Sequence, residues 1–214
     1  MASKSKLARQ NQVKKSKNVN FYIIAIPVIG FLIKLITMMN TPNGGWLGAD
    51  GENYFSGVDG LIADGYLSDK SILSYWPAGY PLLLWPLAEI SITKFYYFIS
   101  FIQSIFYAYA TYFFSSTLNR SSLKKFAFIT SLILSFNPTL SLSSLAVGYE
   151  APIAASFMMV VALFIKYGIN PNEKNFLLIV SSISAWFALV IFMQPRFLLV
   201  GAVFFLYWAF KIAR

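Results

Sequence analysis

The chain has 214 residues, of which 57% are hydrophobic, 18% aromatic and only 12% charged. A soluble domain carries about 25% charged residues, so this chain lacks the polar side chains that a water-facing surface needs, and its composition predicts a membrane protein. The net charge of +9 does not indicate nucleic-acid binding, because the basic residues lie at the ends of apolar runs, where they define topology. The absence of Cys and His excludes thiol catalysis, disulfides, His- or Cys-based zinc and haem sites, and histidine general bases.

The chain begins with a basic tail and a first apolar run. Residues 1–19 carry six Lys and Arg and no acid, which predicts a cytoplasmic tail. Phe21–Met39 is predicted to be the first transmembrane helix, because its length just covers a hydrocarbon core of roughly 30 Å. No small-residue cleavage signature precedes Asn40, so we expect an uncleaved anchor. Lys34, one to two turns from the outer end, is expected either to extend to the interface or to pair with an acid of the following loop.

A long polar loop, residues 40–79, follows the first helix. Five of the eight carboxylates of the chain lie within it, between Asp50 and Asp69. Residues 53–65 are predicted to form a short helix at the membrane surface, with four apolar side chains on one side: Tyr54, Val58, Leu61 and Ile62.

Residues 80–92 are apolar but number only about 13 and contain Pro81 and Pro86. This segment is too short to span a bilayer and is predicted to be re-entrant or interfacial.

The remaining apolar runs are predicted to span the membrane, at residues 95–118, 126–145, 151–168, 176–193 and 197–212. Asn137-Pro138 predicts a kink in the second of them. With these spans, cytoplasmic segments hold 13 Lys and Arg and one acid, whereas outer segments hold three Lys and Arg and seven acids. The positive-inside rule therefore favours an all-α polytopic protein of the cell membrane, with about six spans, both termini cytoplasmic, and residues 20–214 as one membrane domain.

The first candidate site is Asp50-Gly51-Glu52, in the long outer loop. One of two carboxylates at a membrane interface can take a proton from a hydroxyl group, while the other holds the site or binds a cation. The alternative is structural, because a polar loop needs polar residues and Asp caps short helices.

Three further groups are predicted to lie on the same outer side. The turn Trp76–Pro81 is either an aromatic anchor or a wall that binds lipid or sugar. Glu150, after Tyr149, either stabilises a helix N-terminus or adds a second carboxylate to the site. Arg196, after Pro195, can grip a phosphate with two parallel hydrogen bonds, or it serves as an interfacial anchor or ion-pair partner.

Two stretches of this loop carry a resemblance to a known family. They are Gly48-Ala49-Asp50-Gly51-Glu52-Asn53-Tyr54 and Trp76-Pro77-Ala78-Gly79-Tyr80-Pro81. Together with the first helix, they resemble the GT-C superfamily of integral-membrane glycosyltransferases. The likeness is greatest to the group that includes dolichyl-phosphate-mannose protein mannosyltransferases and bacterial lipid A sugar transferases.

The resemblance implies transfer of a sugar from a polyprenyl-phosphate donor to an acceptor glycan, lipid or protein at the outer face. It implies that Asp50 is the general base, Glu52 its acidic neighbour, and Glu150 the acid of the second outer loop. It likens Arg196, with Pro195 before it rather than after it, to the Arg-Pro element of the family. Beside the resemblance, we predict substrate binding by Glu150, Arg196, the aromatic residues Tyr54, Trp76 and Tyr80, and Lys34, which is a further candidate for the leaving phosphate.

Family members have more helices than the about six predicted here, so the resemblance implies that the chain corresponds to their N-terminal module. No cofactor is indicated, and metal dependence stays open. The alternative is a non-catalytic membrane subunit or a transporter for the same kind of lipid-linked sugar.

Overall fold

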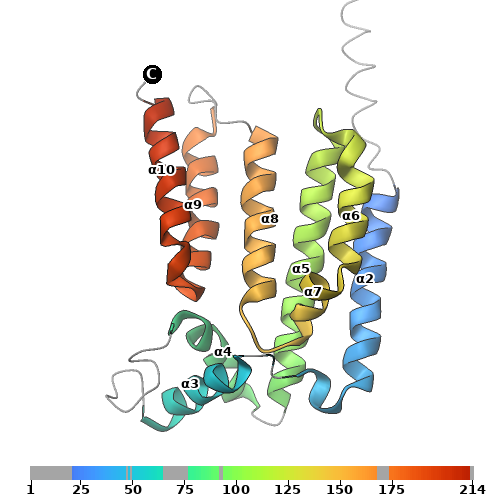
Figure 1. Ribbon diagram of the computed structural model, residues 1–214, viewed down its shortest axis with the longest axis vertical. Coiled ribbons are helices and arrows are strands. Elements are labelled where there is room, and N and C mark those ends of the chain that lie inside the picture. Colours follow the sequence, from blue (N-terminus) through green and yellow to red (C-terminus); the bar gives the residue numbers. More distant parts are fainter. Residues whose placement is uncertain are drawn as a thin grey trace, which may run out of the picture.

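The computed structural model describes residues 21–46, 48, 50–64, 77–91, 94–167 and 174–212, and the predicted basic tail lies outside them. Helices run side by side along the long axis, while α3 and α4 lie across one end (Figure 1). The long-axis elements are α2 (Phe21–Asn40), α5 (Phe95–Asn119), α6 (Ala127–Phe136), α8 (Glu150–Tyr167), α9 (Phe176–Met193) and α10 (Leu198–Ile212). The end is crossed by α3 (Gly51–Asp64) and α4 (Gly79–Ile90).

Three helices are long and apolar enough to cross a membrane: α2, α8 and α9. The bent pair Lys124–Phe136 and Pro138–Leu145 makes a fourth candidate if it counts as one span. Helix α5 has 25 residues, but its Ser, Thr, Gln and Asn side chains lower its hydropathy. The prediction of an all-helical fold is confirmed for the described residues, and three to four of their helices are candidate membrane spans. The number of six spans stays a prediction.

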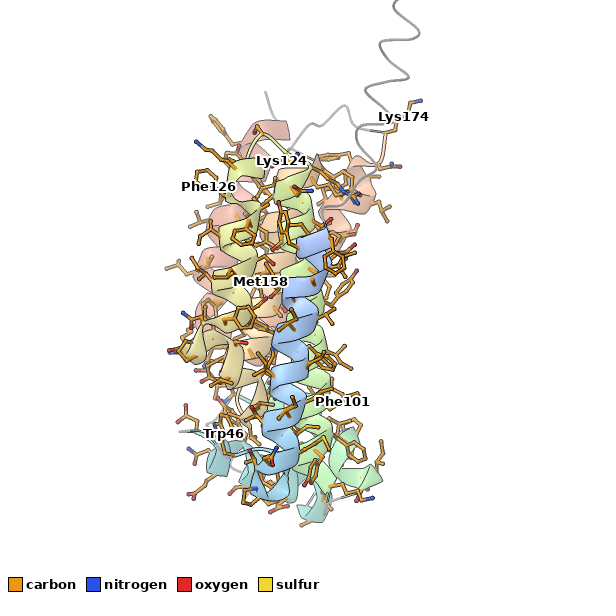
Figure 2. The ribbon with its side chains drawn as sticks, turned by 90° about the vertical axis from the view of Figure 1, so that its right-hand side faces the viewer. Trp46, Phe101, Lys124, Phe126, Met158 and Lys174 are labelled. Atoms are coloured by element: carbon orange, nitrogen blue, oxygen red, sulfur yellow. The ribbon has the colours of Figure 1, made fainter. Side chains whose placement is uncertain are left out.

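The helix bundle places apolar side chains outside and many polar side chains inside. Large Ile, Leu and Phe side chains are exposed on α2 and α6, which face the viewer in Figure 2, and on α10. The buried face of α5, by contrast, is lined by hydroxyl and amide groups, namely Ser100, Gln103, Ser104, Thr111 and Ser115. Such a distribution suits a lipid environment, in which helices associate through small and polar side chains.

The predicted kink separates α6 from α7 (Pro138–Leu142), and the pair is bent by 53°. Because Pro138 has no N–H, the carbonyl of Leu134 loses its helical donor. The Tyr107 hydroxyl of α5 donates to that carbonyl at 2.9 Å, and the Ser141 hydroxyl donates to the Ser135 carbonyl at 2.8 Å. The broken helix is therefore stabilised by side chains that satisfy its freed carbonyls.

The predicted short segment after the loop forms α4, which has 12 residues and is too short to span. Its first residue, Gly79, contacts α9 so closely that an added Cβ would lie 1.7 Å from the carbonyl oxygen of Phe192. Helix α3 packs on α4 through three of its four predicted apolar residues, Tyr54, Val58 and Leu61. The prediction was wrong for Ile62, which is 42% exposed because it is turned about 100° from Leu61 on the helix.

Among the described residues, the carboxylates gather at one end of the long axis and most of the Lys and Arg side chains lie at the other, although Lys94 and Arg196 lie with the carboxylates. The end formed by α3, α4 and the start of α8, which we call the acidic end, carries Asp50, Glu52, Asp59, Glu89 and Glu150. The opposite end, the basic end, carries Arg120, Lys124, Lys125, Lys166 and Lys174. Figure 2 shows Lys124 and Lys174 far from Trp46 of the acidic end. The assignment of the basic end to the cytoplasm remains a prediction from the positive-inside rule.

Candidate functional site

The loop that follows α2 and the turn before α8 are joined by a short backbone pairing. The Trp46 N–H donates to the Leu145 carbonyl at 3.2 Å, and the Val147 N–H donates to the Trp46 carbonyl at 2.9 Å. Gly45 permits this approach, because a Cβ there would lie 2.6 Å from the Leu145 oxygen. From α5, the Ser100 hydroxyl also donates to the Leu145 carbonyl, at 3.1 Å. Two segments about 100 residues apart therefore form one unit that rests on α5.

A pocket of about 380 Å³ opens beside this pairing and is lined by both Asp50 and Glu150; we call it the acidic pocket. Asp50 is half-buried and directly precedes α3, and its backbone carbonyl accepts the first helical hydrogen bonds. Glu150 is exposed and begins α8. At Gly148 a Cβ would lie 2.2 Å from the Glu150 carboxylate, so the missing side chain makes room for that carboxylate over the turn. The walls are completed by α7 and by the 3-10 helix η5 (Ser143–Leu145), including Thr139 and Ser143.

A second pocket, of about 310 Å³, lies against α4, α5 and α9 and has an almost wholly apolar lining; we call it the apolar pocket. Its lining includes Leu83, Ile102 and Phe106, together with Tyr80. The Tyr80 hydroxyl accepts a hydrogen bond of 3.0 Å from the N–H of Gly148, which lines the acidic pocket. Tyr80 therefore lies between the two pockets.

The Tyr80 side chain is a neutral phenol at physiological pH. Burial raises its pKa well above the ordinary value of 10.0, and the nearby Glu150 carboxylate raises the pKa further, against the opposing effect of the Gly148 N–H. Its hydroxyl therefore keeps a proton to donate while it accepts from the backbone.

Three tyrosines pack together beneath the acidic pocket. The Tyr54 ring lies 5.0 Å from the Tyr80 ring and 5.8 Å from the Tyr149 ring, centroid to centroid, and both pairs are edge-on. Arg196, from η6 (Pro195–Phe197), donates to the Tyr149 hydroxyl, with its guanidinium 5.6 Å from the centre of that ring. The exposed Arg196 is therefore held beside the residue that precedes Glu150.

Two predicted site residues lie away from the acidic pocket, and a third cannot be placed. Glu52 is exposed in the first turn of α3 and is not part of the acidic pocket lining. Trp76 lies outside the described residues. Lys34 is buried among the helices, with its ammonium 4.5 Å from the centre of the Tyr107 ring. Lys34 was expected either to extend to the membrane interface or to pair with an acid, and it does neither. The neighbouring helices enclose its side chain, and its ammonium contacts an aromatic face instead of a carboxylate.

Sequence reasoning missed Gly148 and the contact between Tyr149 and Arg196. Gly148 and Tyr149 directly precede Glu150 in the sequence, but the partner of Gly148, Tyr80, lies 68 residues away, and the partner of Tyr149, Arg196, lies 47 residues away. Among the described residues, no group of three or more acidic side chains is placed to hold a metal ion.

Comparisons with protein-family models, curated proteins and solved structures found no match for this chain. Its function is therefore inferred from the two pockets and from the side chains that line them.

Proposed function

We propose that this chain is a membrane glycosyltransferase that moves a sugar from a polyprenyl-phosphate donor to an acceptor hydroxyl at the acidic end. The observation that carries the proposal is the junction at Tyr80 between a pocket with two carboxylates and an apolar pocket. An amphiphile with a hydroxylated head and a long hydrocarbon tail matches the acidic pocket and the apolar pocket, respectively. Its sugar would lie beside Asp50 and Glu150, and its tail beside α4.

In the proposed reaction, Asp50 accepts the proton of the acceptor hydroxyl. The acceptor oxygen forms a bond to the anomeric carbon while the bond from that carbon to the phosphate oxygen breaks. The bonding electron pair leaves with the polyprenyl phosphate, and a single displacement inverts the anomeric configuration. Since the leaving group is already anionic, a strong general acid is less necessary than in glycosidases.

The other site residues bind and orient in this proposal. The Glu150 carboxylate accepts hydrogen bonds from sugar or acceptor hydroxyls. Arg196 turns from Tyr149 to the phosphate, which it can hold with two parallel hydrogen bonds. The buried rings of Tyr54, Tyr80 and Tyr149 keep these groups in place, and Glu52 has no chemical step.

A second candidate is a non-catalytic subunit or transporter for a lipid-linked sugar. The buried Lys34 favours it, because ionisable groups within spanning helices mark transport paths. The buried hydroxyls of Ser131 and Ser135 have no hydrogen-bond partner among the described residues, which suits a path that takes up water. A transporter would move the donor intact, whereas a transferase consumes it.

Replacing Leu83 with Trp is expected to fill part of the apolar pocket and to weaken the use of long-chain donors. Each buried CH₂ group contributes about 0.8 kcal/mol, so the loss of a few tail contacts lowers kcat/KM about tenfold or more. A donor analogue with a short, soluble prenyl chain does not reach this pocket and should be used equally well by the Leu83→Trp variant and the wild type. Transfer of labelled sugar from the two donors measures the difference.

The matched control is Ile90→Trp, on the same helix, at a position that is 70% exposed and outside the pocket lining. It should leave both donors unaffected. An equal loss with long and short donors, or no loss at all, would contradict the placement of the tail.

A further inference from the structure

A third pocket, of about 510 Å³, lies at the basic end, opposite the proposed catalytic site. It is formed where α5 and α8 end, and these helices are adjacent along their lengths. Its lining includes two cations and four Ser and Thr residues: Arg120, Lys166, Ser116, Thr117, Ser121 and Ser122. We call it the basic pocket.

The two cations are supplied by different helices and are held at its rim. The backbone N–H of Arg120 donates to the carbonyls of Ser116 and Thr117 at 3.2 Å. These hydrogen bonds hold the Arg120 backbone, from which the side chain extends, at the end of α5. The Lys166 ammonium lies 5.6 Å from the centre of the Phe113 ring and 4.8 Å from that of Tyr167. Aromatic rings position an ammonium without neutralising its charge, so the Lys166 ammonium keeps its positive charge beside these rings.

The local charge balance favours an anion. The C-terminal ends of α5 and α8 each contribute about half a negative charge, while the two side chains contribute two positive charges, which leaves about one positive charge. The residues that line the pocket, all within the described part of the chain, include no carboxylate. Hydroxyl groups of Ser116 and Thr117 on its buried side are donors suited to phosphate oxygens.

We propose that the basic pocket binds a phosphate-bearing head group, and that it is a binding site separate from the acidic pocket. The guanidinium of Arg120 takes two phosphate oxygens, and the Lys166 ammonium acts as a point charge on the same group. Tyr112 and Phe113 form the apolar side of the pocket, where the glycerol and upper acyl region of a phospholipid would lie. The same chemistry accepts a free phosphate ion, so the experiment compares both sources.

The test measures binding of phosphatidylglycerol, phosphatidylcholine and inorganic phosphate to the purified full-length chain by native mass spectrometry. The double variant Arg120→Gln/Lys166→Gln is compared with Lys124→Gln/Lys125→Gln, which removes the same charge at the same end outside the pocket lining. We expect the first variant to bind the anionic lipid about tenfold more weakly and the second to change its affinity less than about twofold. The single Lys166→Gln change, at an exposed position, should show an intermediate loss if the double variant does not fold.

Each outcome either supports or overturns the proposed phosphate site. Selective loss of phosphatidylglycerol supports the pocket with a membrane lipid as its ligand, and selective loss of inorganic phosphate supports it with a soluble ligand. Equal losses in the two double variants would show diffuse attraction to a basic surface and would overturn the proposal. Unchanged binding in all variants would overturn it as well.

Discussion

Replacing Asp50 with Asn is expected to reduce sugar transfer by about 10²- to 10⁴-fold, the contribution of a general base. Asn has the size of Asp but cannot accept a proton from the acceptor hydroxyl. It is as good a residue before a helix as Asp, so the start of α3 should be preserved. The rate of label transfer from a polyprenyl-phosphate sugar, normalised to folded protein in the membrane, measures the effect.

Asp59→Asn is the matched control for this prediction. Asp59 is an exposed residue of α3, the helix that Asp50 precedes, and it lies outside the acidic pocket lining. Its replacement removes the same charge. Transfer by this variant should equal that of the wild type. If Asp50→Asn retained more than about a tenth of the wild-type rate, Asp50 would not be the base.

Replacing Gly79 with Ala is expected to cause the largest loss of stability. The added methyl group would lie 1.7 Å from the carbonyl oxygen and 2.4 Å from the carbonyl carbon of Phe192, and backbone atoms cannot rotate away as a side chain can. Helix α4 must therefore move off α9, which separates Tyr80 from the Gly148 N–H. Overpacking of this kind costs about 3 kcal/mol. The measurement is the midpoint of thermal unfolding in detergent, together with the yield of monodisperse protein.

Gly201→Ala in α10 serves as the control for Gly79→Ala. Its added methyl group would lie 3.0 Å from the end of the Ile191 side chain, which can move, and at an ordinary contact distance of 3.9 Å from the Phe187 ring. Alanine is also favoured over glycine within a helix by about 1 kcal/mol, so stability should be unchanged or slightly higher. Equal behaviour of the two variants would contradict the close contact between α4 and α9.

The helices were predictable because their causes are local. The apolar run of α9 predicted Phe176–Met193 without error. The run at residues 80–92 was expected to be short, and α4 has 12 residues; its re-entrant or interfacial position stays a prediction. The kink before Pro138 follows from the missing N–H of proline. Apolar runs do not fix the number of spans, because polar residues that are buried inside the bundle lower the hydropathy of α5.

The candidate site was predictable only in part. Topology alone placed Asp50 and Glu150 on one side, but their common pocket depends on the pairing of Trp46 with Ala146, which no local pattern encodes. The surroundings of Lys34 were also not predictable from its position in the sequence. Its distance from the helix end predicted contact with the interface or an acid, whereas packing of α2 against α5 placed it over Tyr107.

The central claim is that the chain consumes a polyprenyl-phosphate sugar at the acidic end. The most direct test incubates the purified wild-type chain in liposomes with polyprenyl-phosphate hexoses labelled in the sugar and with glycan, lipid and peptide acceptors. We predict that label leaves the lipid donor and appears in an acceptor with inverted anomeric configuration. Donor that remains intact with every acceptor, or that only crosses to the other leaflet, would contradict the claim.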